Sequence, residues 1–473
     1  MTPPEEIAGA ATAQDTNLPF PQPLVAMVSE GQLAARVTPS LLRRAYAARK
    51  PRRTSGPREK RMPVLVMKFG GTSVANLDRI RRAAKRIGVE VAKGYDVIVI
   101  VSAMSGKTNE LVGWVEETSP LFDAREYDAV VSSGENVTAG LMALTLQEMD
   151  VPARSWQGWQ VPLKTTSAHS AARIVDIPPA NITQKFAEGM RVAVVAGFQG
   201  LSPEGRITTL GRGGSDTTAV AFAAAFGAER CDIYTDVDGV YTTDPRICAK
   251  ARKLDKIAFE EMLELASLGA KVLQTRSVEL AMRYGVKLRV LSSFEEQSDK
   301  AGTLVCAEED IMESNVVNGV AYSRDEAKLT LLSVADRPGV AATIFSALSE
   351  AGVNVDMIVQ NISEEGRTDM TFSCPTNEVA RAEAALDRIK QDGHLNYAEL
   401  VADTDVAKVS VVGIGMRSQS GVAAKMFKVL SDEGINIKVI TTSEIKISVL
   451  IDRKYMELAV QALHDAFELD KAA

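Results

Sequence analysis

The sequence has few of the side chains that bind metals through nitrogen or sulfur. Its 473 residues include only three histidines and four cysteines, and neither set has the close spacing of a zinc site. They are His169, His394, His464, Cys231, Cys248, Cys306 and Cys374. Cysteines scattered in this way are typical of a protein in a reducing compartment. We therefore expect a cytoplasmic protein that holds no metal ion by its own side chains.

Long hydrophobic runs and a basic excess are also missing. No stretch approaches the roughly eighteen uninterrupted apolar residues that suggest a membrane-spanning helix. The net charge is −7, whereas proteins that bind nucleic acids present basic surfaces that neutralise phosphates. Neither a membrane nor a nucleic acid is therefore expected as a partner. With 46% hydrophobic and 24% charged residues, the chain has the balance of a globular protein with a packed core.

Residues 1–61 differ from the rest of the chain. They are rich in Pro, Ala and Arg, show no sustained periodicity, and carry ten Lys and Arg against five Asp and Glu. Such a composition is typical of a segment that forms no core. We expect a disordered extension, or sequence upstream of a true start at Met62. A targeting peptide is the alternative, although an apolar core followed by a cleavage site is lacking.

From Met62 to about Cys306, apolar runs alternate with stretches of helical periodicity. This alternation is typical of a largely parallel sheet covered by helices on both faces. Buried strands are expected at 97–101, 192–196, 231–235 and 286–291. Helices are expected at 76–93, 125–149, 216–227, 259–267 and 275–284.

Three stretches of this region have the composition of a ligand site. Leu65-Val-Met-Lys-Phe-Gly-Gly-Thr-Ser73 is an apolar strand that ends in two glycines before a helix, which lets backbone N–H groups approach a phosphate. Thr208-Thr-Leu-Gly-Arg-Gly-Gly-Ser-Asp-Thr-Thr-Ala219 adds an arginine that can bind a carboxylate or phosphate in bidentate fashion. Ile233-Tyr-Thr-Asp-Val-Asp-Gly-Val-Tyr-Thr-Thr-Asp-Pro-Arg246 places a polar loop after a strand, where open α/β sheets bind nucleotides. Read alone, the first stretch is also compatible with a tight strand-to-helix turn and the second with a helix cap. The acidic residues of the third also suggest a calcium loop, but no Glu occupies its last ligand position.

The C-terminal part contains an internal repeat with an offset of 82 residues. Between 339–358 and 421–440, ten of twenty positions are identical. Each copy reads as strand, loop, amphipathic helix, strand and a further strand. Two small α+β modules of one fold are therefore expected in tandem.

Four motifs, followed by this repeat, closely resemble those of the aspartate kinases. They are Lys68-Phe-Gly-Gly-Thr-Ser73, Ser132-Ser-Gly-Glu-Asn136, Gly211-Arg-Gly-Gly-Ser-Asp-Thr-Thr218 and Tyr234-Thr-Asp-Val-Asp-Gly-Val-Tyr-Thr-Thr-Asp-Pro-Arg246. The resemblance runs from residue 62 to about residue 470, and residues 1–61 have no counterpart in it. It implies an α/β fold, the amino-acid kinase αβα sandwich with a mostly parallel sheet. The boundaries that it implies are a kinase domain at 62–306, a connector at 307–320, and two α+β, ferredoxin-like ACT regulatory domains at 321–401 and 402–473.

The reaction implied by this resemblance is transfer of the γ-phosphoryl group of ATP to the β-carboxylate of L-aspartate. The product, 4-phospho-L-aspartate, leads to lysine (through diaminopimelate), threonine and methionine. Because a carboxylate is already ionised at neutral pH, no general base is required. Lys68 is expected to neutralise the transferring phosphoryl group, with Gly70 and Gly71 as backbone donors, and Asp216 to orient Lys68.

The resemblance also implies the residues that bind the substrates. For aspartate they are Thr108, Glu135, Arg173, Arg212, Gly213, Gly214 and Ser215. Glu135 would contact the substrate ammonium group and Arg212 a substrate carboxylate. For ATP they are Lys68, Phe69, Gly70, Gly71, Ser215, Thr235, Asp236, Asp238, Tyr241, Arg246, Lys271 and Val272. The alternative for Arg246 and Lys271 is that they are solvated charges on the surface and do not bind ATP. Mg²⁺ is expected to arrive with ATP, held by phosphates and water.

The repeats are expected to bind lysine, threonine or both as feedback inhibitors. Polar side chains and a helix N-terminus at a module interface suit a zwitterionic ligand. The residues expected there are Asp336, Gly339, Val340, Ala341, Asn354, Val355, Asp356, Gln360, Ser363, Asn436, Ile437, Ser443 and Glu444. The alternative is that these residues only form turns and helix caps. We also expect a homo-oligomer that associates through these domains, and leave open a shorter regulatory subunit from an internal start.

Two other functions are compatible with parts of the pattern. One is a kinase of the same fold with another acceptor, such as glutamate, acetylglutamate, carbamate or a nucleoside monophosphate. The other is an amino-acid sensor without catalysis, which a replaced Lys68 or Asp216 would favour; both residues are present.

Overall fold

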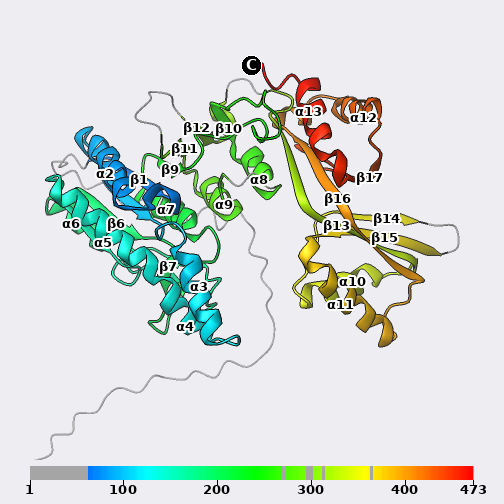
Figure 1. Ribbon diagram of the computed structural model, residues 1–473, viewed down its shortest axis with the longest axis horizontal. Helices are drawn as coiled ribbons and strands as arrows, with labels where there is room; N and C mark the ends of the chain where they lie inside the picture. Colours follow the sequence, from blue (N-terminus) through cyan, green and yellow to red (C-terminus); the bar gives the residue numbers. More distant parts are fainter. Residues whose placement is uncertain (1–61, 269–271, 295–301, 312–314, 363–365, 472–473) are drawn as a thin grey trace, which may run out of the picture. The chain divides into compact units, whose positions relative to one another are not determined.

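The computed structural model describes residues 62–268, 272–294, 302–311, 315–362 and 366–471 (Figure 1). The expected disordered extension at 1–61 lies outside these residues, as do Lys271 and Ser363.

An eight-stranded sheet forms the centre of the kinase region, with strand order β10-β12-β11-β9-β1-β2-β6-β3. All of its pairings are parallel except that between β11 and β12. The strands are β1 (Val64–Phe69), β2 (Asp96–Val101), β3 (Ala153–Trp156), β6 (Val192–Ala196), β9 (Cys231–Thr235), β10 (Lys256–Ala258), β11 (Leu288–Ser292) and β12 (Thr303–Cys306). Three of the four expected strands are confirmed to within one residue, and the fourth begins at Leu288 instead of Val286.

Helices cover both faces of this sheet, because successive residues of its strands point into two different cores. Leu65 and Val97 pack with helices α2 and α5, whereas Val66 and Ile98 face the core that contains α7, α8 and α9. The helices of this region are α2 (Leu77–Ala92), α3 (Lys107–Thr118), α4 (Ala124–Val131), α5 (Ser133–Glu148), α6 (Ala180–Ala187), α7 (Gly214–Phe226), α8 (Phe259–Ser267) and α9 (Thr275–Tyr284). The expected αβα sandwich is confirmed.

The single helix expected at 125–149 is wrong, since α4 and α5 are separate helices that meet at Ser132. Ser132, Ser133 and Gly134 at this junction are poor helix formers, and Gly134 also makes a close contact. A Cβ on Gly134 would lie 2.7 Å from Cβ of Ala103, so only glycine lets α5 approach the end of β2 this closely. Apolar periodicity continues through the break and therefore did not reveal it.

A small four-stranded sheet, in the order β5-β4-β7-β8, is built from segments on either side of β6 in the sequence. Its strands are β4 (Lys164–Thr165), β5 (Ile174–Asp176), β7 (Gln199–Leu201) and β8 (Ile207–Thr209). They are too short for a periodicity argument, and the sequence did not predict them. This sheet carries the segments 166–173 and 210–213, which hold two of the expected arginines.

The C-terminal part builds one six-stranded antiparallel sheet in the order β14-β15-β13-β16-β18-β17. Its strands are β13 (Gly319–Ala335), β14 (Ile358–Ile362), β15 (Arg367–Cys374), β16 (Glu399–Val412), β17 (Ile437–Thr442) and β18 (Lys446–Asp452). Its helices are α10 (Val340–Glu350), α11 (Val379–Gln391), α12 (Val422–Asp432) and α13 (Met456–Ala466). The tandem α+β modules are confirmed.

The two modules share their central strands. Leu329 of β13 packs in the core of the first module, whereas Val320 of the same strand packs with Val409 and Met426 in the core of the second. The segment expected as a connector, 307–320, thus contributes Val317 and Val320 to the second core. Among the residues described, no helix is both long and apolar enough to cross a membrane.

Candidate active site

Lys68 and Asp216 form an ion pair at the carboxyl edge of the main sheet. Lys68 is the fifth residue of β1, and Asp216 lies in the first turn of α7, which packs against β1. The distance between Lys68 Nζ and Asp216 Oδ1 is 2.5 Å, and both side chains are about nine-tenths buried. The pair fixes the ammonium group at the end of the strand. This is the geometry expected if Asp216 orients Lys68.

Glycines bring backbone close together around this pair. A Cβ on Gly70 would lie 3.3 Å from Lys68 Nζ, and one on Gly71 would lie 3.0 Å from the Ala103 carbonyl oxygen. Gly213 has a φ of +72° and lies directly before α7, and a Cβ there would lie 2.0 Å from Cγ of Gln274. Gly71 and Gly213, from two sequence motifs, are therefore favoured here by a close backbone approach and by a positive φ.

Glu135 lies in the first turn of α5 and is almost fully buried. Its Oε1 accepts a hydrogen bond of 3.0 Å from the backbone N–H of Ala103 at the end of β2. Its Oε2 is buried and makes no hydrogen bond to the described residues. Burial raises the pKa of Glu135 to about 7, although the Ala103 N–H acts in the opposite direction. A carboxyl group in this setting gains from a cationic hydrogen-bond donor.

Arg173 and Arg212 are exposed and come from neighbouring segments. Ala172 N–H donates to the Thr209 carbonyl oxygen at 2.9 Å, and a Cβ on Gly211 would lie 3.3 Å from the Ser170 oxygen. Residues 37 and 41 positions apart in the sequence are thus brought side by side. Thr108 is partly buried near the start of α3, and Ser215 is buried at the start of α7.

Arg276 of α9 is a residue that the sequence interpretation missed. It donates from Nη1 to the Leu210 oxygen and from Nη2 to the Ala172 oxygen, both at 2.9 Å. Its pKa is lowered, mainly by burial and then by nearby Arg173. An arginine in an amphipathic helix reads as solvated surface, so no local signal could have identified it.

The loop after β9 forms a polar cluster of its own. Asp238 accepts hydrogen bonds from Tyr241 Oη at 2.9 Å and from Lys253 Nζ at 3.2 Å. Partial burial favours its neutral form, but these two contacts outweigh that effect and its pKa is lowered. Thr235 donates to the exposed Asp236 at 3.1 Å. Lys253, which the sequence interpretation also missed, is thus part of the expected nucleotide region.

Arg246 is highly exposed and contacts Asp244 with two nitrogens, at 3.0 and 2.7 Å. The hydrogen bond from Arg246 lowers the pKa of Asp244 to about 2, and Tyr322 of β13 also donates to Asp244. Val272 packs partly buried against the core, and Lys271 lies outside the described residues. The roles expected for these residues in ATP binding stay predictions.

The expected effector residues of the first module do not lie together in one group. Gly339, Val340 and Ala341 begin α10, and Asp336 lies in the preceding turn. The Asn354 and Asp356 side chains instead contact Glu378 and Lys408, at 3.2 and 2.5 Å. Three further residues of this set have other places: Val355 packs partly buried in the core, Gln360 is exposed on β14, and Ser363 lies outside the described residues.

In the second module, Asn436 and Ile437 line a surface hollow beside the end of α12. Ser443 Oγ accepts a long hydrogen bond of 3.4 Å from Ile445 N–H. Glu444 is exposed and lies 3.4 Å from Arg417. Glu444 and Asn436 thus have different neighbours, and the effector roles of these residues stay predictions.

Comparison with known proteins finds a family for the kinase region and for each of the two C-terminal modules. Residues 63–292 match the amino acid kinase family, and residues 329–394 and 409–467 each match an ACT domain. An aspartate kinase of Stutzerimonas stutzeri is 53% identical over 413 residues, which cover 87% of this chain and 99% of that protein. The aspartokinase of Corynebacterium glutamicum is 46% identical over 413 residues, which cover 86% of this chain and 97% of that protein.

Solved structures give the same result. Aspartokinase III of E. coli in complex with aspartate and ADP has a TM-score of 0.71 at 28% identity and covers 85% of this chain and 99% of its own. The same E. coli enzyme in complex with lysine and aspartate has a TM-score of 0.68 at 28% identity, with equal coverage.

Proposed function

Because the chain belongs to the aspartate kinase family, we propose that it transfers the γ-phosphoryl group of ATP to the β-carboxylate of L-aspartate. It is a phosphotransferase whose acceptor is a carboxyl group. The product would be 4-phospho-L-aspartate, the first intermediate of the branch to lysine, threonine and methionine. The observation that carries this proposal is the Lys68–Asp216 pair at the same sheet edge as the buried Glu135.

For this reaction the protein must position the two substrates and neutralise the negative charge that develops on the phosphoryl group. The acceptor carboxylate is ionised at neutral pH and needs no base. Lys68 Nζ would contact the transferring phosphoryl group, where charge accumulates in the transition state, and Asp216 would hold Lys68 in place. The N–H groups of Gly70 and Gly71 would donate to phosphate oxygens.

Aspartate carries two carboxylates and one ammonium group, and the proposed pocket has a partner for each. Glu135 Oε2 would accept from the ammonium group, and Arg212 and Arg173 would bind carboxylate oxygens. Thr108 and Ser215 would add hydroxyl donors. Partner groups of opposite sign are what separates an amino-acid substrate from a simple dicarboxylate.

ATP would lie along the loop from Thr235 to Tyr241, close to Val272, Lys271 and Arg246. No cluster of three or more His, Cys, Asp or Glu side chains able to hold a metal occurs among the residues described. We therefore propose that Mg²⁺ enters as the complex with ATP and neutralises phosphate charge there. Asp238 and Lys253 would shape this loop through their mutual contact.

The ACT modules are proposed to bind lysine, threonine or both, and to inhibit the kinase. The E. coli enzyme was solved with lysine, which supports this choice of ligand class. β14 and β17 are the edge strands of the six-stranded sheet, and an edge strand offers unpaired backbone groups to a second copy. We propose association through these modules, and a reducing cytoplasm as the compartment, since all four cysteines are buried free thiols.

The test is ATP turnover with L-aspartate as acceptor and hydroxylamine as the trap for the acyl phosphate. Aspartate-dependent hydroxamate that lysine or threonine suppresses would support both halves of the proposal. Turnover with another acceptor would keep the kinase and replace the substrate. Saturable threonine or lysine binding without hydroxamate would instead favour the sensor.

A further inference from the structure

We propose that Asp128 is a positioning residue for aspartate binding, which holds together the two segments that carry Arg173 and Arg212. Asp128 lies on α4 and is completely buried. The proposal rests on the proposed function, because the roles of the two arginines belong to it. Asp128 itself would touch neither substrate.

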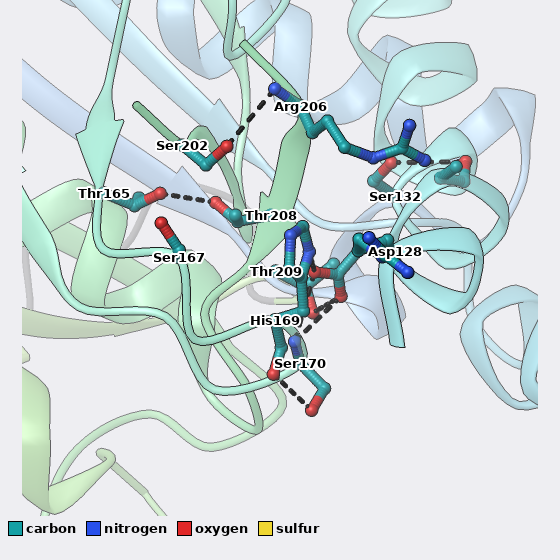
Figure 2. Close-up of polar contacts among 12 residues, drawn as sticks. Asp128, Ser132, Thr165, Ser167, His169, Ser170, Ser202, Arg206, Thr208 and Thr209 are labelled. Atoms are coloured by element: carbon teal, nitrogen blue, oxygen red, sulfur yellow. Dashed lines mark hydrogen bonds and ion pairs between the residues drawn. The ribbon is translucent and has the colours of Figure 1, made fainter. Parts of the chain in front are cut away.

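The Asp128 carboxyl group accepts hydrogen bonds from three residues of two segments (Figure 2). His169 Nδ1 lies 2.7 Å from Oδ2, and the Ser170 N–H lies 3.1 Å from both oxygens. Thr209 Oγ1 donates to Oδ1 at 2.5 Å. Since a carboxylate only accepts, all three neighbours must donate, and the contact fixes the tautomer of His169.

These donors lie just before the two arginines in the chain. Ser170 precedes Arg173 by three positions, and Thr209 precedes Arg212 by three. The segments are also joined directly, since Ala172 N–H donates to the Thr209 oxygen at 2.9 Å. Asp128 therefore joins these two segments from the side of α4, in addition to the contacts that Arg276 of α9 makes with Leu210 and Ala172.

The backbone of Ser170 has an unfavourable conformation in this arrangement. Ser170 has a φ of +63°, which a residue with a side chain rarely adopts. Its N–H is the group that donates to both Asp128 oxygens, so the contact offsets the cost of this conformation. A side chain at 128 without an acceptor oxygen would leave this strain without that compensation.

The other carboxylate of the same helix is arranged differently. Glu126 is exposed and pairs with Arg206, also at the surface. Asp128, in contrast, is joined to uncharged donors and a histidine and is fully enclosed. Glu126→Gln is therefore a matched control that removes one carboxylate of α4 outside the buried contact.

The experiment measures kcat and the KM values for aspartate and ATP in Asp128→Asn, Thr209→Val and Glu126→Gln. Thr209→Val keeps the buried volume and removes one donor, so it carries the test even if Asp128→Asn fails to fold. Loss of a hydrogen bond to a charged group predicts a rise of about tenfold in the KM for aspartate, with the KM for ATP within about twofold. Glu126→Gln should match the parent enzyme.

Two results would overturn the proposal. One is an unchanged KM for aspartate in Thr209→Val, and the other is an equal rise in both KM values, which would indicate a general loss of structure. Arg212→Ala separates this from the proposed function. If Arg212→Ala leaves the KM for aspartate unchanged, the assignment of the aspartate site has failed; if it raises that KM while Thr209→Val does not, only the role of Asp128 has failed.

Discussion

Lys408 of β16 lies 2.5 Å from Asp356, a residue expected to bind an effector, and so connects the first module to a central strand of the second. The same ammonium group lies 2.5 Å from Glu326 of β13. Lys408 and Glu326 are both more than nine-tenths buried, whereas the Asp356 side chain is half exposed. Burial alone would lower the pKa of Lys408, but the two carboxylates outweigh it and its pKa is raised.

Lys408→Met is expected to lower the free energy of unfolding by about 3–5 kcal/mol, because it leaves Glu326 buried without its cation. Asp356→Asn should cost less than about 1 kcal/mol, since solvent screens that contact. Urea unfolding measures both. Lys438→Met is the control, because Lys438 also lies 2.6 Å from two carboxylates but is about one-fifth exposed. Equal losses in the two lysine variants would show that burial of Glu326 is not the cause.

Lys68→Ala is expected to reduce kcat by roughly 10²- to 10³-fold, the usual effect of removing a group that stabilises transition-state charge. Asp216→Asn should reduce kcat less, because Lys68 keeps its charge and loses only its orientation. The hydroxamate assay at saturating substrates measures both. Lys250→Ala, which removes an exposed lysine paired with Asp465, is the control. Activity retained in Lys68→Ala would remove this residue from the mechanism.

The sequence predicted those parts of the site that lie within one motif. Lys68 and Asp216 could be found because each follows or precedes glycines in a strand-to-helix turn, where the pattern is local. Asp128 and Arg276 could not, since their partners lie 41 and 66 or more positions away and no pattern within α4 or α9 distinguishes them from surface charges.

The same limit applies to the fold. Strands at 97–101 and 192–196 were predictable because each is a continuous apolar run. The sharing of β13 between two module cores was not, because Val320 and Leu329 belong to one alternating strand and only pairing with β16 separates them.

The KM for aspartate is expected to fall as pH rises through about 7. Burial raises the pKa of Glu135 to about 7, so the ionised form that would bind the substrate ammonium group becomes dominant only above that value. Steady-state kinetics between about pH 6 and pH 8 measure the effect. Glu135→Gln should have a high KM that is independent of pH in this range. A parent enzyme whose KM for aspartate stays constant would argue against this role.

Stability should change with pH in the opposite direction. The pKa of Glu135 is higher in the folded state than its ordinary value of 4.5, so between these values the folded state binds more protons. The contribution to the free energy of unfolding is therefore complete below about pH 4.5 and lost as pH rises through about 7, by up to about 3 kcal/mol. Thermal unfolding of Glu135→Gln across this range should show a smaller decline than the parent enzyme.

Glu261 joins the kinase domain to the second module. Its Oε1 accepts from Ile414 N–H at 2.9 Å and from Asn318 Nδ2 at 2.7 Å, and the side chain is fully buried on α8. α8 packs against α9, which begins directly after Gln274 and carries Arg276. A displacement of Ile414 would therefore act on the helix that holds the segment before Arg212.

Glu261→Gln is expected to weaken the proposed feedback inhibition, because an amide places an N–H where the carboxylate accepts from Ala258 and loosens the contact with Ile414. Coupling between an effector and a catalytic site is typically worth about 1–3 kcal/mol, so the inhibition constant for lysine or threonine should rise at least about fivefold. The KM for ATP should not change. Glu279→Gln, at an exposed position of α9, is the control. If Glu261→Gln keeps the inhibition constant of the parent enzyme, the coupling runs through other contacts, and Lys446 with Glu264, 2.8 Å apart, is the next pair to change.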